Sequence, residues 1–121
     1  MKKVNVAEKL EIIQDYWNPR ITGELNGQQV RLVKIKGEFV FHHHEHEDEM
    51  FLVIKGSIKL VFTDQTIEVN EGEFIIVPRG VTHKPIAENE AHLMMFTLAT
   101  NVNTGNVYNE RTLDTEYLRK I

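Results

Sequence analysis

The chain has 121 residues, a formal net charge of −4 at pH 7 and no cysteine. A chain of this length suits one domain that buries roughly two-thirds of the surface its unfolded form would expose. The missing cysteines exclude disulfides, thiolate metal ligands and a cysteine nucleophile, and they are compatible with a cytoplasmic location.

Neither nucleic acid nor a membrane is an expected partner. Lysine and arginine residues are scattered along the chain, so there is no basic stripe to hold a phosphate backbone. The apolar runs are far shorter than the ~20 residues of a membrane helix. We therefore predict a single domain over residues 1–121 that functions without either partner.

The N-terminal segment predicts one short helix. Asn5 is suited to cap it, because its side chain can accept a hydrogen bond from the backbone N–H of Glu8. An apolar stripe follows at Leu10, Ile12 and Ile13. The pattern extends to about Tyr16, and Asn18-Pro19 is expected to end the helix. Charged residues interrupt this segment, so no export signal is predicted.

From residue 20 onward the sequence changes to short β-branched and aromatic runs separated by turn residues. The turn signals are Asn26-Gly27, Gly37, Lys55-Gly56, Thr63-Asp64-Gln65, Asn70-Glu71-Gly72 and Arg79-Gly80. About eight strands fit between residues 20 and 100, with no helix between them. This pattern predicts an all-β fold, a sandwich or barrel of the jelly-roll kind. The polar tail after residue 100 is expected to end in a strand or a short helix.

The segment FHHHEHEDEM, residues 41–50, holds four histidines and four acidic residues. Successive residues of a strand point to opposite faces, so His42 and His44 can converge while His43 turns away. Glu49 opens the next apolar run, where an antiparallel neighbour would bring its carboxylate beside the pair. From this tract alone, a metal site and a hydrated loop are both open interpretations.

A second segment, GEFIIVPRGVTHKPIA at residues 72–87, places His83 just after a turn. Together the two segments resemble the two motifs of the cupin superfamily. The first comprises Gly37, His42, His44, Glu49 and Gly56, with one gap a residue away from the family spacing, and the second comprises Gly72, Pro78, Gly80 and His83. Ala87 stands where the family usually has asparagine. The resemblance to a small single-domain cupin implies a double-stranded β-helix, or jelly-roll barrel, with a short N-terminal helix.

The resemblance also implies a metal site inside the barrel, with His42, His44, Glu49 and His83 as ligands. Imidazole and carboxylate ligands suit a divalent first-row transition metal, and Zn, Fe, Ni, Mn and Cu all stay open. His46 is the alternative to His42, since it also stands two residues from His44, but it would shorten the gap to Glu49. His92 is expected to be structural, unless the strand that holds it presents the opposite face.

Strand alternation predicts the surroundings of the site. Val40, Phe51 and Val53 would share the inner face and give the metal an apolar wall. The opposite face would carry Phe39, Phe41, Met50, Leu52 and Ile54, too much apolar surface to leave in solvent. Because the N-terminal helix can cover only part of it, we expect a homodimer built back to back. A monomer whose helix covers the whole face is the alternative.

Three functions follow from such a site. The first is a dioxygenase-like enzyme that acts on an enolisable or aromatic small molecule, and the second is a Zn- or Mn-dependent isomerase of a sugar or keto acid. An isomerase needs a base, and only His46, His92 or Tyr16 could be suggested, which favours the dioxygenase. The third is a small-molecule binding protein without turnover.

Overall fold

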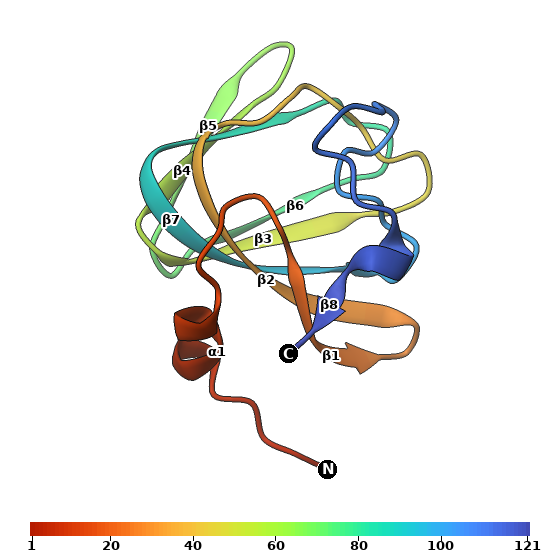
Figure 1. The fold of residues 1–121 in the computed structure, drawn as a ribbon. Coiled ribbons are helices and arrows are strands. Elements are labelled where there is room, and N and C mark those ends of the chain that lie inside the picture. Colours follow the sequence, from red (N-terminus) through yellow and green to blue (C-terminus); the bar gives the residue numbers. More distant parts are fainter.

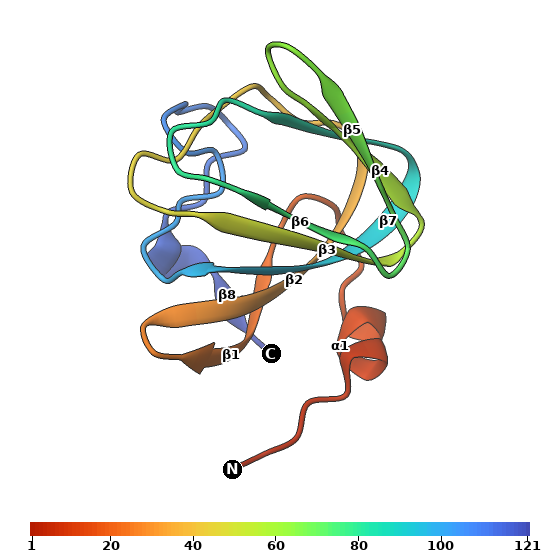
Figure 2. The same ribbon diagram turned by 180° about the vertical axis from the view of Figure 1, so that it is seen from behind.

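The computed structural model describes all 121 residues. Its elements are α1 (Val6–Ile12), β1 (Arg20–Leu25), β2 (Gln28–Glu38), β3 (Glu49–Lys55), β4 (Ser57–Val61), β5 (Thr66–Asn70), β6 (Phe74–Val77), β7 (Lys84–Leu98), a 3-10 turn (Thr115–Tyr117) and β8 (Arg119–Lys120). The strands curve around a shared interior, and α1 lies outside them (Figures 1 and 2). The predicted all-β fold with a short N-terminal helix is confirmed.

The long strand β7 organises the sheet. It pairs antiparallel with β2 along most of its length, with β3 along its second half, and with β4 near its start. The resulting strand order is β5-β4-β7-β2-β1-β8, with β3 joining β7 to β6. The sheet bends around its contents without closing completely, which is a jelly-roll arrangement.

The interior of the sheet is apolar at one end. Along β3 the buried residues alternate with partly exposed ones, so that Phe51 and Val53 point inward as predicted. They join buried residues of β2, β4, β5, β6 and β7 in one cluster of 11 side chains. Burial of this cluster supplies the main driving force for folding.

Helix α1 begins where the sequence predicts. The Asn5 Oδ1 accepts a hydrogen bond of 3.0 Å from the backbone N–H of Glu8. Leu10 and Ile13 pack on Leu32 at the outer surface of β2. At seven residues α1 is short, and no helix in the structure has the length and apolar character needed to cross a membrane.

The helix ends earlier than the predicted limit near Tyr16. Trp17 has a φ angle of 61° and docks on β2. Its backbone N–H donates to the carbonyl of Lys34 at 2.9 Å, and its indole N–H donates to the carbonyl of Lys36 at 2.9 Å. These two hydrogen bonds direct the chain along the strand, so the helix cannot continue.

The histidine segment was predicted to be a strand, in which side chains alternate between two faces. In the structure it is a loop. Between β2 and β3 the only ladder contact is a bridge between His42 and His83. Gly37, predicted to form a turn, lies within β2 at a register shift. Because strand alternation is interrupted here, the prediction that Phe39 faces away from the site is wrong. Phe39 is buried, whereas Phe41, which was expected to lie on a covered outer face, is exposed.

The tail after β7 folds back against the histidine loop (Figures 1 and 2). The Asn106 side chain accepts a hydrogen bond of 2.8 Å from the backbone N–H of His43, and the Asn106 N–H donates to the His43 carbonyl at 3.0 Å. The chain then makes the 3-10 turn, and β8 pairs in parallel with β1. Both predicted alternatives for the tail therefore occur, one after the other.

We predict that Gly105→Ala lowers the free energy of unfolding by about 1–3 kcal/mol, as expected for overpacking. Gly105 has a φ of +54°, and an added Cβ would collide with the carbonyl of His43. The control is Gly27→Ala, where φ is +76° and nothing lies within 4 Å of the new Cβ. Urea unfolding measures both. Equal destabilisation by the two changes would contradict the predicted collision.

Candidate metal centre

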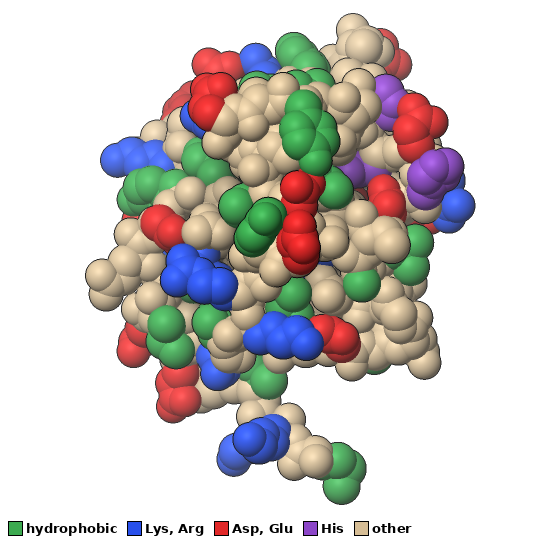
Figure 3. Space-filling view, turned by 45° about the vertical axis from the view of Figure 1, so that its right-hand side comes forward, with side chains coloured by type: hydrophobic (Ala, Val, Ile, Leu, Met, Phe, Trp, Pro, Cys, Tyr) green, Lys and Arg blue, Asp and Glu red, His purple; other side chains and the backbone are tan.

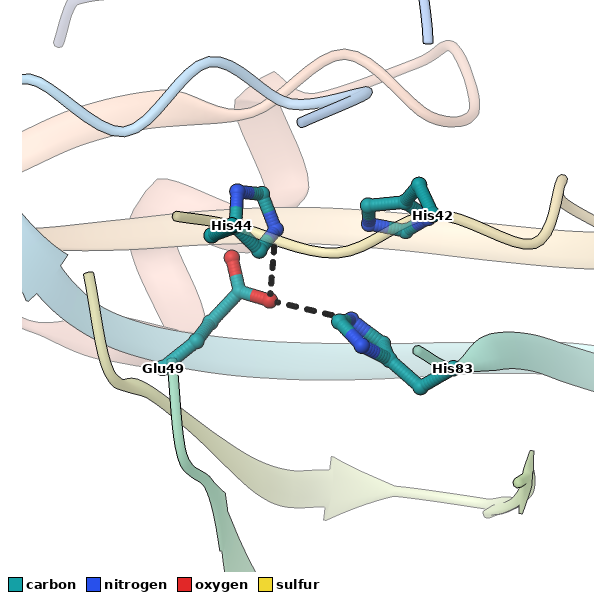
Figure 4. A group of neighbouring side chains, drawn as sticks. All are labelled: His42, His44, Glu49 and His83. Carbon is teal, nitrogen blue, oxygen red and sulfur yellow. Dashed lines mark ion pairs between the residues drawn. The ribbon is translucent and has the colours of Figure 1, made fainter. Parts of the chain in front are cut away.

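Three segments of the chain bring four polar side chains together inside the barrel. His42 and His44 come from the loop after β2, Glu49 is the first residue of β3, and His83 directly precedes β7. One ligand atom from each lies within 4.8 Å of the others, and all four residues are buried. Figure 4 shows the four side chains directed toward a common point.

The spacing of the Glu49, His44 and His83 donor atoms fits a single ion. His44 Nε2 and His83 Nε2 lie 3.4 and 3.5 Å from Glu49 Oε1. Two ligand atoms that share an ion at about 2.1 Å are about 3.0–3.4 Å apart. The ring nitrogens of His44 and the Nε2 of His83 are buried without a hydrogen-bond partner. Since buried polar atoms are normally paired, these residues fit a divalent metal.

Two of the imidazoles are oriented by backbone carbonyls. His42 Nδ1 lies 2.8 Å from the Val40 oxygen, and His83 Nδ1 lies 2.9 Å from the Val81 oxygen. A carbonyl only accepts hydrogen bonds, so each Nδ1 carries a proton and donates to the carbonyl, and each Nε2 is the nitrogen left to face the centre. This is the usual way in which proteins orient a metal-binding histidine.

The protonation states also suit a cation. Burial is the main reason that the pKa of His42 falls to about 4, and repulsion from His83 adds to it, so His42 is neutral at pH 7. Burial alone would raise the pKa of Glu49, but its interactions with the rings of His44 and His83 outweigh this and hold the pKa well below its ordinary value. The centre therefore combines the neutral imidazole of His42 with the carboxylate of Glu49.

Asn101 holds this carboxylate in place. Its Nδ2 donates to Glu49 Oε2 at 3.1 Å and to Thr97 Oγ1 at 2.9 Å. Thr97 in turn donates to the Asp48 carbonyl at 2.8 Å. Glu49 Oε1 is thereby directed at the histidines. Asn101 could not be predicted from the sequence, because it lies in the polar tail and no motif or spacing marks it.

The remaining histidines lie outside the cluster. His46 is exposed, and His43 turns away from the centre to contact Glu45 at 2.6 Å. On the face in Figure 3, the surface histidines gather at one edge among acidic side chains, and basic and acidic groups are interspersed elsewhere.

No side chain suggested as a base faces the cluster. His92 Nε2 and the Tyr16 hydroxyl both contact Glu90, each at 2.7 Å, on the outside of the sheet. His46 is exposed, as noted above, and Glu49 is the only buried carboxylate in the chain. The centre therefore offers no second acid or base beyond the four clustered side chains.

A cavity of about 50 Å³ adjoins the cluster. His42 and Glu49 line it, together with Trp17, Arg31, Phe39, Phe51, Leu93 and Met95. Phe51 contributes the predicted apolar wall, but Val40 does not line the cavity and Val53 lies deeper in the core. Phe39 lines the cavity in place of the expected Val40. Its ring stacks on that of Trp17, with ring centroids 4.8 Å apart.

Arg31 was not predicted to line the site, although its position along β2 indicates it. Along β2 the residues at 29, 31, 33 and 35 are all buried, and they include two branched aliphatic side chains. The alternation that placed Phe51 inside also places Arg31 inside, next to Val33 and Ile35.

The fold and the buried histidine and glutamate cluster define a small jelly-roll protein with a candidate metal centre. Residues 29–99 match the family model of the cupin domain. This match covers more than half of the chain, so the chain belongs to the cupin family.

Solved structures agree with this assignment. A cupin-2 domain protein from Shewanella frigidimarina is 40% identical and has a TM-score of 0.76, and the match covers 77% of this chain and 91% of that protein. A protein from Neisseria meningitidis is 32% identical with a TM-score of 0.75, and here the match covers 80% and 99%.

A curated relative matches over a shorter stretch. The uncharacterized protein YdbB of Bacillus subtilis is 34% identical over 62 residues, which is 50% of this chain. The match spans 55% of YdbB, little more than half of that protein.

Proposed function

We propose that this protein is a metal-dependent enzyme of the dioxygenase type that acts on an enolisable or aromatic small molecule. The proposed ligands of one divalent first-row transition metal are His42, His44, Glu49 and His83. The observation that carries the proposal is the set of buried, unpartnered ring nitrogens beside an apolar cavity.

The residues around the centre favour a substrate with a flat or apolar body. Trp17, Phe39 and Phe51 offer large apolar surfaces and exclude water, whereas the many hydroxyls of a sugar would lose their hydrogen bonds there. A bound metal would supply open coordination positions and Lewis-acid or redox chemistry.

The lack of a further buried acid or base bears on the type of reaction. Proton abstraction needs a group with a suitable pKa within hydrogen-bond reach of the substrate. Glu49 is held by Asn101 and directed at the histidines, so an isomerase would have no obvious base. A substrate that is enolised before it binds has already moved its α-hydrogen from carbon to oxygen, so no protein base is needed to abstract it from carbon. This makes an oxidative reaction the better supported one.

We predict that His42→Ala and His83→Ala each reduce metal affinity by about tenfold or more, because the remaining donors cannot complete the coordination shell. His46→Ala is the matched control and should keep about one metal ion per chain. Elemental analysis of protein purified without chelators measures the metal content. Full metal content in both cluster variants, with loss in His46→Ala, would overturn the proposed ligand set.

We predict that metal-loaded protein binds acetylacetone or a catechol more tightly than glucose, and that only a redox-active metal supports O₂ uptake. The reason is that a bidentate enolate displaces bound water at little cost and also fits the apolar wall. Calorimetry with wild-type and His44→Ala protein measures binding, and an oxygen electrode measures turnover. Tighter binding of glucose would favour the isomerase, and binding without turnover would indicate a binding protein.

We also propose a homodimer formed through the outer face of β3, β6 and β7. Met50 and Leu52 pair across the sheet with Ile76 and Phe74, and Met50 also pairs with Phe96. Phe74 and Ile76 are 61% and 55% exposed, which is unusual for neighbouring large apolar side chains. The face differs from the one expected from sequence, because Phe39 lies inside the barrel and Ile54 packs near α1.

We expect light scattering at micromolar concentration to give the mass of a dimer. Ile76→Lys should convert it to a monomer, because a charge on this face opposes its burial. Leu25→Lys, at an exposed position at the end of β1, is the control and should leave the mass unchanged. A monomer mass for the wild-type protein would contradict the proposed dimer.

A further inference from the structure

Arg31 is an unusual residue to find in the lining of an apolar cavity. Arg31 is only 2% exposed, and it lines the same cavity as His42 and Glu49. Its neighbours along the inner face of β2 are Val33 and Ile35, which belong to the core. Burying a guanidinium here removes its favourable free energy of hydration, a penalty that an aliphatic side chain would not have.

The protein contacts of Arg31 satisfy only part of its hydrogen-bonding capacity. Nε donates to Gln29 Oε1 at 3.0 Å, Nη1 to the Asn101 carbonyl at 2.9 Å, and Nη2 to the Ala99 carbonyl at 3.3 Å. All three acceptors are uncharged. A guanidinium has five N–H groups, so two of them have no protein acceptor.

Burial lowers the pKa of Arg31, and the charges of Glu49 and Glu47 partly offset that effect. An arginine nevertheless stays protonated in proteins, so one residue of the cavity wall carries a permanent positive charge. Buried charges are normally paired or bound to a ligand.

Arg31 lines the same cavity as two residues of the candidate metal centre, His42 and Glu49. Asn101 accepts from Arg31 through its carbonyl and donates to Glu49 through its side chain. One residue therefore fixes the guanidinium relative to the carboxylate of the centre. A molecule in the cavity would meet the guanidinium and the metal centre together, with Trp17 and Phe39 against its apolar body.

We propose that Arg31 is a specificity-determining residue that receives an anionic group of the ligand, so that the ligand is a small organic acid with an enolisable or flat apolar body. This inference rests on the function proposed above and narrows its substrate class from neutral diketones and phenols to carboxylates. The guanidinium fork matches the two oxygens of a carboxylate, which can accept both remaining N–H groups.

Acetylacetone and acetylpyruvate form a matched pair of probes, because they differ only in that a carboxylate replaces one terminal methyl group. Trp17 is the only tryptophan in the chain and lines the cavity, so its fluorescence reports binding of either compound. Zinc-loaded wild-type protein should bind acetylpyruvate about 10- to 100-fold more tightly, the range that charge-assisted hydrogen bonds provide. Equal affinity in the wild-type protein would overturn the proposal without any variant.

Arg31→Gln should lose that preference while it keeps its metal content and its affinity for acetylacetone. Lys36→Gln, an exposed position on the same strand, removes one positive charge outside the cavity and should keep the preference. Arg31→Lys retains the charge without the fork and should give an intermediate preference. A purely structural Arg31 would weaken both ligands equally, and a full preference in Arg31→Gln would place the carboxylate on the metal instead.

Binding measurements on zinc-free wild-type protein distinguish a failure of this inference from a failure of the proposed function. If neither probe depends on zinc for binding, the proposed metal-dependent function fails. The role of Arg31 is then judged separately, by whether Arg31→Gln changes the ratio of the two affinities.

Discussion

The candidate centre depends on one pair of backbone hydrogen bonds, which His42 and His83 exchange at 3.0 and 2.9 Å. The loop that carries His42 and His44 lies outside the ladders of the sheet, so this bridge positions it against the segment before β7. Two neighbouring contacts complete the positioning. His43 is held by Asn106, and the His44 carbonyl accepts from Gly80 N–H at 2.8 Å. Three consecutive histidines are thereby anchored to two segments, the connection between β6 and β7 and the tail after β7.

Charge and solvation then determine what this arrangement can do. His42 is a neutral imidazole, and Glu49 supplies a single negative charge. Aromatic and aliphatic side chains exclude water, which strengthens each electrostatic interaction in the cavity. In such surroundings the guanidinium of Arg31 and the carboxylate of Glu49 act as fixed charges of opposite sign, with Asn101 between them.

The sequence predicted the parts of the site whose spacing reflects a regular physical constraint. A two-residue step brings His42 and His44 to one side even in an extended loop, and β3 alternates from Glu49 to Phe51 as a strand must. Phe39 was misplaced because residues 39–48 form a loop, in which the alternation of a strand does not hold between Phe39 and His42.

Other features depend on contacts between distant segments, which local patterns do not contain. The early end of α1 follows from the hydrogen bonds between Trp17 and β2, and the role of Asn101 follows from a contact across 52 residues. Arg31 is a different case, because the alternation of side chains along β2 indicates that it points inward. It was missed because a charged residue on an inner face contradicts the usual expectation of an apolar core.

The contact between the tail and the histidine loop has a consequence for the order of folding during translation. Residues 101–106 complete the surroundings of Glu49 and His43, so these contacts cannot form until that stretch has left the ribosome. The strands up to β6 can begin to pair earlier, but β7 joins β2, β3 and β4 only when it emerges. Closure of the site is therefore a late event, and the nascent chain exposes its histidine loop to cellular metal ions before the loop's final geometry exists.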